Sequence, residues 1–192
     1  MNRGIPHKTK KLTASALLAA LGVALLFLGS FIETLDLTVA CLASFFCLFA
    51  VIEIGGAYPW LIFATTGILA VVLMPYSLGG WFYLLIFGYY PILKDKIERL
   101  PKVFALAIKI VLCNLALIFG TLVTFFLFFG NTEGKTLIDA FMFVFGGEEI
   151  GEIFAIGVYL LANVTFIVYD FALTRLIIFY FAKIRKRIKF LK

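Results

Sequence analysis

Apolar runs long enough to cross a lipid bilayer recur along this sequence, and they constrain its fold more than any other feature. A helix needs about 20 predominantly apolar residues to span the hydrocarbon core. Hydrophobic residues make up 64% of the 192-residue chain, well above the share in a soluble domain. We therefore expect an all-α integral membrane protein, a single domain over residues 1–192 built as a bundle of six transmembrane helices. The expected spans are Leu12–Ile32, Leu35–Ile54, Ala57–Met74, Leu78–Leu93, Val103–Phe129 and Ile153–Ala182.

Basic residues cluster on one side of this expected bundle. They occur in the short tail at 1–11, in the loop after the fourth expected span, and in the tail at 183–192. The connections on the other side hold Lys135 and seven acidic residues. The positive-inside rule then predicts a multi-pass protein of the cell membrane with both termini in the cytoplasm. The basic face is expected to contact anionic lipid headgroups, and an acidic partner protein is the alternative.

The sequence lacks the patterns of several common functional sites. "GNTEGKT" (130–136) has one residue too few between its glycines for a phosphate-binding loop, and the single histidine, His7, lies in the basic tail. Cys41, Cys47 and Cys113 lie in apolar runs and suit core positions. We expect no cofactor, no metal and no enzymatic activity, and no nucleic acid partner because no aromatic–basic module accompanies the charge. In the one long connection, "LIDAFMFVF" (137–145) is predicted as a short amphipathic helix at the membrane interface.

Two of the expected spans carry polar residues at helical spacing. In the sixth span these residues are separated by four, seven and four positions, which places them on one helix face. The fifth span has a similar stripe, and two polar stripes in a membrane are expected to face each other. The stripes are Tyr159, Asn163, Asp170 and Thr174 in the sixth span, and Asn114, Thr121 and Thr124 in the fifth.

The polar residues support two interpretations that the sequence leaves open. In the first they clamp helices together, with Asp170 paired to Lys109, Glu53 paired to Arg175, and the asparagines forming interhelical hydrogen bonds. In the second they bind a substrate. Asn114, Tyr159 and Asn163 would then line a polar cavity that opens outward, and Asp170 with Lys109 would close its floor.

The first expected span carries a ridge of small residues. Ala16, Ala20 and Ala24 repeat every four positions, a pattern that lets another helix approach closely. The ridge would serve either packing within the chain or docking of a partner subunit.

These features together resemble a known family. Six short spans, cytoplasmic ends, fewer than 200 residues, no ATPase motif and the Ala16-x-x-x-Ala20-x-x-x-Ala24 ridge resemble the substrate-binding S components of energy-coupling-factor transporters. The resemblance implies that the ridge packs on a separate transmembrane coupling subunit, that two cytoplasmic ATPases complete the complex, and that a vitamin-like substrate binds toward the outer side. "FGYYPILK" (87–94) is also similar to uncharacterised YybS-like membrane proteins.

The sequence thus favours a membrane-embedded small-molecule-binding subunit of an ATP-powered uptake transporter whose motor lies on other chains. The alternative is a non-transport membrane assembly or regulatory protein that docks through its basic cytoplasmic face.

Overall fold

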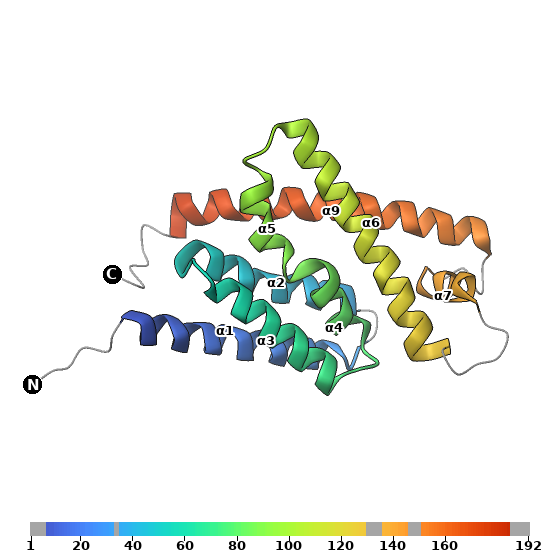
Figure 1. The fold of residues 1–192 in the computed structure, drawn as a ribbon, viewed down its shortest axis with the longest axis horizontal. Helices are drawn as coiled ribbons and strands as arrows, with labels where there is room; N and C mark the ends of the chain where they lie inside the picture. The colour runs from blue at the N-terminus through green and yellow to red at the C-terminus, as the bar shows by residue number, and fades with distance from the viewer. Residues whose placement is uncertain (1–6, 33–34, 130–135, 146–150, 185–192) are drawn as a thin grey trace, which may run out of the picture. The chain divides into compact units, whose positions relative to one another are not determined.

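The computed structural model describes residues 7–32, 35–129, 136–145 and 151–184, and these residues are helical or lie in turns, with no strand among them (Figure 1). The chain divides into two compact units, a first within Met1–Lys102 and a second within Val103–Ile188. Each unit is described by itself.

Four helices are long and apolar enough to cross a membrane, which indicates a membrane protein. They are Lys8–Gly29, Asp36–Glu53, Lys102–Leu127 and Ile153–Lys183. These four agree with the first, second, fifth and sixth predicted spans to within a few residues. The predicted third span corresponds to a shorter apolar helix, Tyr58–Leu73.

The first unit begins with three helices that lie side by side, α1 (His7–Gly29), α2 (Asp36–Glu53) and α3 (Tyr58–Leu73) (Figure 1). The Lys11 ammonium donates to the carbonyl oxygen of Ile54 at 2.9 Å, so the start of α1 meets the end of α2. This bond also satisfies a carbonyl that the end of α2 would otherwise leave unpaired. The reversal into α3 uses Gly55 and Gly56, whose φ angles of 65° and 67° favour glycine.

The packing face of α1 consists mainly of small residues. Ser15, Ala19, Gly22, Leu26 and Gly29 are all buried, at a spacing of four, three, four and three. A Cβ atom on Gly22 would lie 2.9 Å from Cγ2 of Thr66 on α3, so the two helices approach more closely than any side chain at position 22 would allow. Small residues therefore set the distance between these helices.

The fourth predicted span is not one continuous helix. The structure divides Leu78–Leu93 among α4 (Leu78–Phe82), a π-helical turn (Tyr83–Phe87) and the start of α5 (Tyr90–Ile97). Pro91, in the first turn of α5, has no N–H to continue hydrogen bonding to the preceding turn. Gly88 lies so close to the rings of Phe63 and Tyr83 that a Cβ atom there would meet them at 2.6 and 2.9 Å. The expectation of six regular helices is wrong at this segment.

The interrupted segment packs on α2 from its first residues. The Ser77 hydroxyl, just before α4, donates to the buried Asp36 carboxylate in the first turn of α2 at 3.2 Å. Farther along, the hydroxyl of Tyr83 lies 3.1 Å from Sγ of Cys47, and both side chains are completely buried. The segment therefore runs in the same direction as α2, as alternating crossings require.

The second unit contains two long helices and a short one. The long helices are α6 (Lys102–Thr124), extended by a π-helical turn at Phe125–Phe129, and α9 (Glu152–Phe179), extended by a π-helical turn at Tyr180–Ile184. The short helix α7 (Leu137–Val144) lies between the end of α6 and the start of α9, and Figure 1 shows α6 crossing α9. The predicted short helix is confirmed as a helix, and its location at a membrane interface stays a prediction.

Candidate functional site

An ion pair joins the two long helices of the second unit. Nζ of Lys109 on α6 donates to Oδ2 of Asp170 on α9 at 2.7 Å. Their side chains are 13% and 19% exposed, so most of the surface of both charged groups is removed from the surroundings. The predicted pairing of these two residues is confirmed.

A cluster of amide and hydroxyl groups lies farther along the same pair of helices. Nδ2 of Asn114 donates to Oδ1 of Asn163 at 3.0 Å, and the Tyr159 hydroxyl donates to Oδ1 of Asn114. Each asparagine also bonds the backbone of its own helix, at Ile110 and Tyr159 respectively. Because higher residue numbers on α6 pair with lower numbers on α9, the two helices are antiparallel. We refer to Asn114, Tyr159 and Asn163 as the amide–tyrosine cluster.

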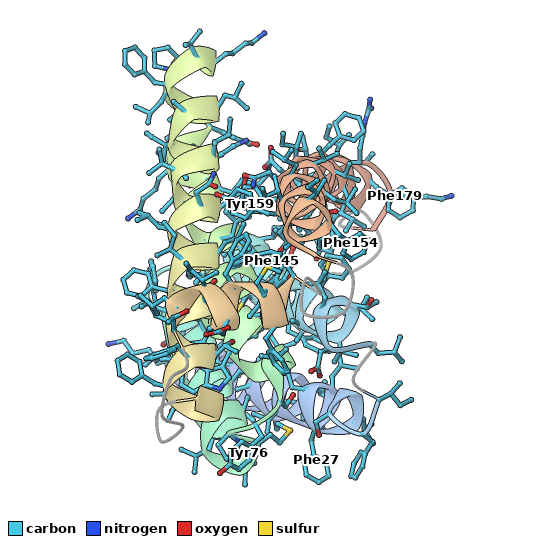
Figure 2. All side chains as sticks on the ribbon, turned by 90° about the vertical axis from the view of Figure 1, so that its right-hand side faces the viewer. Phe27, Tyr76, Phe145, Phe154, Tyr159 and Phe179 are labelled. Atoms are coloured by element: carbon cyan, nitrogen blue, oxygen red, sulfur yellow. The ribbon has the colours of Figure 1, made fainter. Side chains whose placement is uncertain are left out.

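Aromatic rings of α7 adjoin this cluster. The rings of Phe141 and Phe145 lie 6.0 and 5.6 Å from the ring of Tyr159, and 4.7 Å from each other. Figure 2 shows Phe145 beside Tyr159, between α7 and α9. The carboxylate of Asp139 accepts hydrogen bonds from the backbone N–H and the hydroxyl of Thr136, which fixes the start of α7. Aromatic rings thus adjoin a few polar groups here, a combination that is common at small-molecule sites.

Helix length places the amide–tyrosine cluster near the middle of a bilayer. Asn163 is about 15 Å from Ile153, the first residue of its candidate span, at about 1.5 Å per residue. Asn114 is about 20 Å from Leu127, the last residue of the α6 span, by the same rise. The hydrocarbon core is about 30 Å thick, so both counts fall in its central part. Lys109 and Asp170 lie roughly 7 to 10 Å farther along their helices than the cluster, toward the side of the membrane where basic residues are concentrated.

The side chains of the cluster are half-buried, and their hydrogen bonds are largely mutual. Asn114, Tyr159 and Asn163 each keep part of their surface accessible. The remaining residues of the two predicted stripes bond locally, since the hydroxyls of Thr121, Thr124 and Thr174 donate to backbone carbonyls four residues earlier. The polar contact between α6 and α9 that the hydrogen bonds define is therefore smaller than the stripes suggested.

The second predicted ion pair is not tested by these contacts. Glu53 is the last residue of α2 in the first unit, and Arg175 lies on α9 in the second, so their pairing stays a prediction. Within its own unit the Arg175 guanidinium lies over the ring of Phe171, 4.8 Å from the ring centre.

The alanine ridge lies outside the packing face of α1. Ala16, Ala20 and Ala24 are all exposed. The residues that pack α1 against its neighbours are the small and apolar residues from Ser15 to Gly29 described above. The ridge therefore takes no part in packing within the first unit, and both roles expected for it stay predictions.

A buried lysine and two aromatic residues are features that the sequence did not reveal. Lys94 is only 1% exposed and pairs with Glu98 at 2.7 Å, although its place in a basic loop indicated a solvated residue. Phe141 and Phe145 were not assigned to the site, because their contact with Tyr159 depends on tertiary packing. The amphipathic pattern of α7 was the only available signal.

Possible metal ligands and cysteines were located in the part of the chain that the structure describes. No group of three or more His, Cys, Asp or Glu side chains there could hold a metal ion. The three cysteines are free thiols.

Comparison with known proteins gives no family assignment. Family models, curated proteins and solved structures were all searched, and none matches this chain.

Proposed function

We propose that this chain is the small-molecule-binding subunit, embedded in the cell membrane, of an ATP-powered uptake transporter whose motor lies on other chains. Those chains would be a transmembrane coupling subunit and cytoplasmic ATPases. By the resemblance to S components, the ligand would be vitamin-like.

The observation that carries this proposal is the position of the amide–tyrosine cluster. Counted along the candidate spans, its three polar side chains fall near the middle of a bilayer, and the rings of Phe141 and Phe145 adjoin Tyr159. Polar groups in hydrocarbon are costly and tend to be retained where they serve a pathway or a ligand. Because the cluster is half-buried, a ligand could replace some of its mutual hydrogen bonds with bonds of its own.

The exposed alanine ridge supports the assembly part of the proposal. A transporter subunit without its own motor has to dock to a partner inside the membrane. Small exposed side chains at four-residue spacing allow the close helix approach that such docking needs.

We also propose six crossings with both termini in the cytoplasm. The first unit supports four, because α1, α2, α3 and the interrupted segment Leu78–Ile97 alternate in direction. The antiparallel pair α6 and α9 adds two. Reporter fusions after Lys96 and after Lys192 should both give the cytoplasmic signal, and one after Lys135 the external signal. An external signal at Lys96 would exclude the six-crossing arrangement.

One observation favours the alternative of a non-transport assembly or regulatory protein. The hydrogen bonds of the amide–tyrosine cluster are mostly satisfied within the cluster, as in a clamp between helices. In that case the basic cytoplasmic face would dock the partner.

Affinity purification from the native membrane tests the proposal. The tagged chain would be purified in mild detergent, and the retained proteins and released small molecules identified by mass spectrometry, with Asn163→Leu as a parallel sample. We expect a second membrane subunit with ATPases, and a small molecule that wild type retains and Asn163→Leu loses. Recovery of the chain with neither would move the conclusion to the assembly or regulatory role.

A further inference from the structure

We propose that α9 carries a binding site for the headgroup of an anionic phospholipid, formed by Phe171, Arg175, Phe179 and Lys183. The inference is independent of the transporter proposal. The four residues repeat every four positions, so they lie along one side of the helix. We call them the cation–aromatic stripe.

Each cation of the stripe lies over the aromatic ring one turn before it. The guanidinium carbon of Arg175 is 4.8 Å from the centre of the Phe171 ring, and Nζ of Lys183 is 5.7 Å from the centre of the Phe179 ring. All four side chains are exposed, and Figure 2 shows Phe179 projecting outward from α9. The rings restrain the cations and leave their outer side open to a ligand.

Both cations stand apart from the carboxylates that the structure describes in their unit. Among the described residues of the second unit, no carboxylate pairs with Arg175 or Lys183. Asp170, the nearest acidic residue in the sequence, is bonded to Lys109. An aromatic face attracts a cation by only about 0.5 to 2 kcal/mol and does not cancel its charge. A negatively charged ligand would complete the site.

The length of α9 places the stripe at the edge of the hydrocarbon core. The candidate span Ile153–Lys183 has 31 residues and extends about 46 Å at 1.5 Å per residue, whereas the core is about 30 Å thick. With Ile153 at one boundary, the other boundary falls near Leu173. Arg175 then lies about 3 Å beyond the core, at the level of the glycerol and phosphate groups, and Lys183 lies about 15 Å beyond it, on the aqueous side of the headgroups.

The chemistry at that level fits a phospholipid. A guanidinium binds two oxygens of a phosphodiester at once, which a lysine ammonium does not match. Phe171, about 3 Å inside the boundary, is 58% exposed and offers apolar surface to the acyl chains. Lys183 adds attraction for a headgroup with net negative charge, and the sequence after it continues with five further basic residues.

Lipid titration followed by native mass spectrometry tests this site. The full chain in mild detergent would be titrated with phosphatidylglycerol or with phosphatidylcholine of the same acyl chains. The variants would be Arg175→Gln, Arg175→Lys and Lys183→Gln. Lys102→Gln removes an exposed lysine at the first residue of α6, outside the stripe, and serves as the matched control.

Wild type should bind phosphatidylglycerol at least fivefold more tightly than phosphatidylcholine. Arg175→Gln and Lys183→Gln should each weaken phosphatidylglycerol binding about fivefold, equivalent to about 1 kcal/mol per basic residue. Arg175→Lys should lose less than Arg175→Gln, and Lys102→Gln should stay within about twofold of wild type. Equal binding of the two lipids, or equal losses in Lys102→Gln and Arg175→Gln, would overturn the proposal. If Arg175→Gln is not recovered folded, Arg175→Lys and Lys183→Gln are compared with Lys102→Gln instead. Losses equal to that of Lys102→Gln in both variants would then overturn the proposal.

Discussion

Lys109 and Asp170 form a 2.7 Å ion pair between two antiparallel helices that are each long enough to cross a membrane. Each group alone would place an unpaired charge in an apolar span, which costs about 2.5 to 3.5 kcal/mol at a helix centre and less toward its ends, where these two residues lie. The pair therefore fixes the register of α6 against α9, and the amide–tyrosine cluster depends on that register.

Removing either charge should destabilise the second unit. We expect Lys109→Met and Asp170→Leu each to lower the free energy of unfolding by about 2 to 3 kcal/mol, because each leaves its partner unpaired. The double variant should recover most of that loss, since two apolar side chains leave no orphan charge. Equilibrium unfolding of all four proteins in mixed detergent micelles gives the coupling energy. Additive losses in the double variant would show that the two residues do not stabilise each other.

The amide–tyrosine cluster should affect ligand retention more than stability. Asn163→Leu breaks the bond to Asn114, and interhelical hydrogen bonds in membranes contribute about 0.6 to 2 kcal/mol. We expect a loss of stability in that range together with loss of the retained small molecule. Thr165→Val is the control, because the exposed Thr165 hydroxyl bonds only the Leu161 carbonyl of its own helix. Wild-type ligand retention combined with a larger loss of stability would identify the cluster as a helix clamp.

The exposed ridge on α1 should determine assembly. Ala20→Trp places a large side chain where a partner helix would approach, so we expect the partner subunit to be lost on purification while the protein stays monodisperse. Ala172→Trp makes the same substitution at an exposed position on α9 and should retain the partner. Pull-down with quantitative mass spectrometry compares the two. An intact complex with Ala20→Trp would exclude docking through the ridge.

Contacts between periodic polar residues could be predicted from the sequence. Lys109 with Asp170 and Asn114 with Asn163 follow from helical spacing and from the cost of facing lipid, because only a neighbouring helix satisfies these groups. The interruption at Gly88 could not be foreseen in the same way, since it depends on how closely Phe63 and Tyr83 pack there.

Burial was harder to predict than contact. Lys94 lies in a charged segment, yet it is buried, because the position of α5 follows from the interrupted helix before it. Similarly, α1 carries two sets of small residues, and the sequence does not say which set faces inward. The alanine ridge is the more regular of the two, but the packed set includes Gly22, which allows the closer approach.

That close approach leads to a final prediction about glycine. Gly22→Ala should lower the free energy of unfolding by about 1 to 3 kcal/mol, the usual cost of overpacking, because the new Cβ would lie 2.9 Å from Cγ2 of the completely buried Thr66. Gly120→Ala is the matched control inside α6, where a Cβ atom would have no neighbour within 4 Å. That change should leave stability unchanged or raise it by up to about 1 kcal/mol, since alanine is the better helix former. Equilibrium unfolding of both variants in the same micelles provides the comparison. Equal stability of the two variants would mean that Gly22 does not set the distance between α1 and α3.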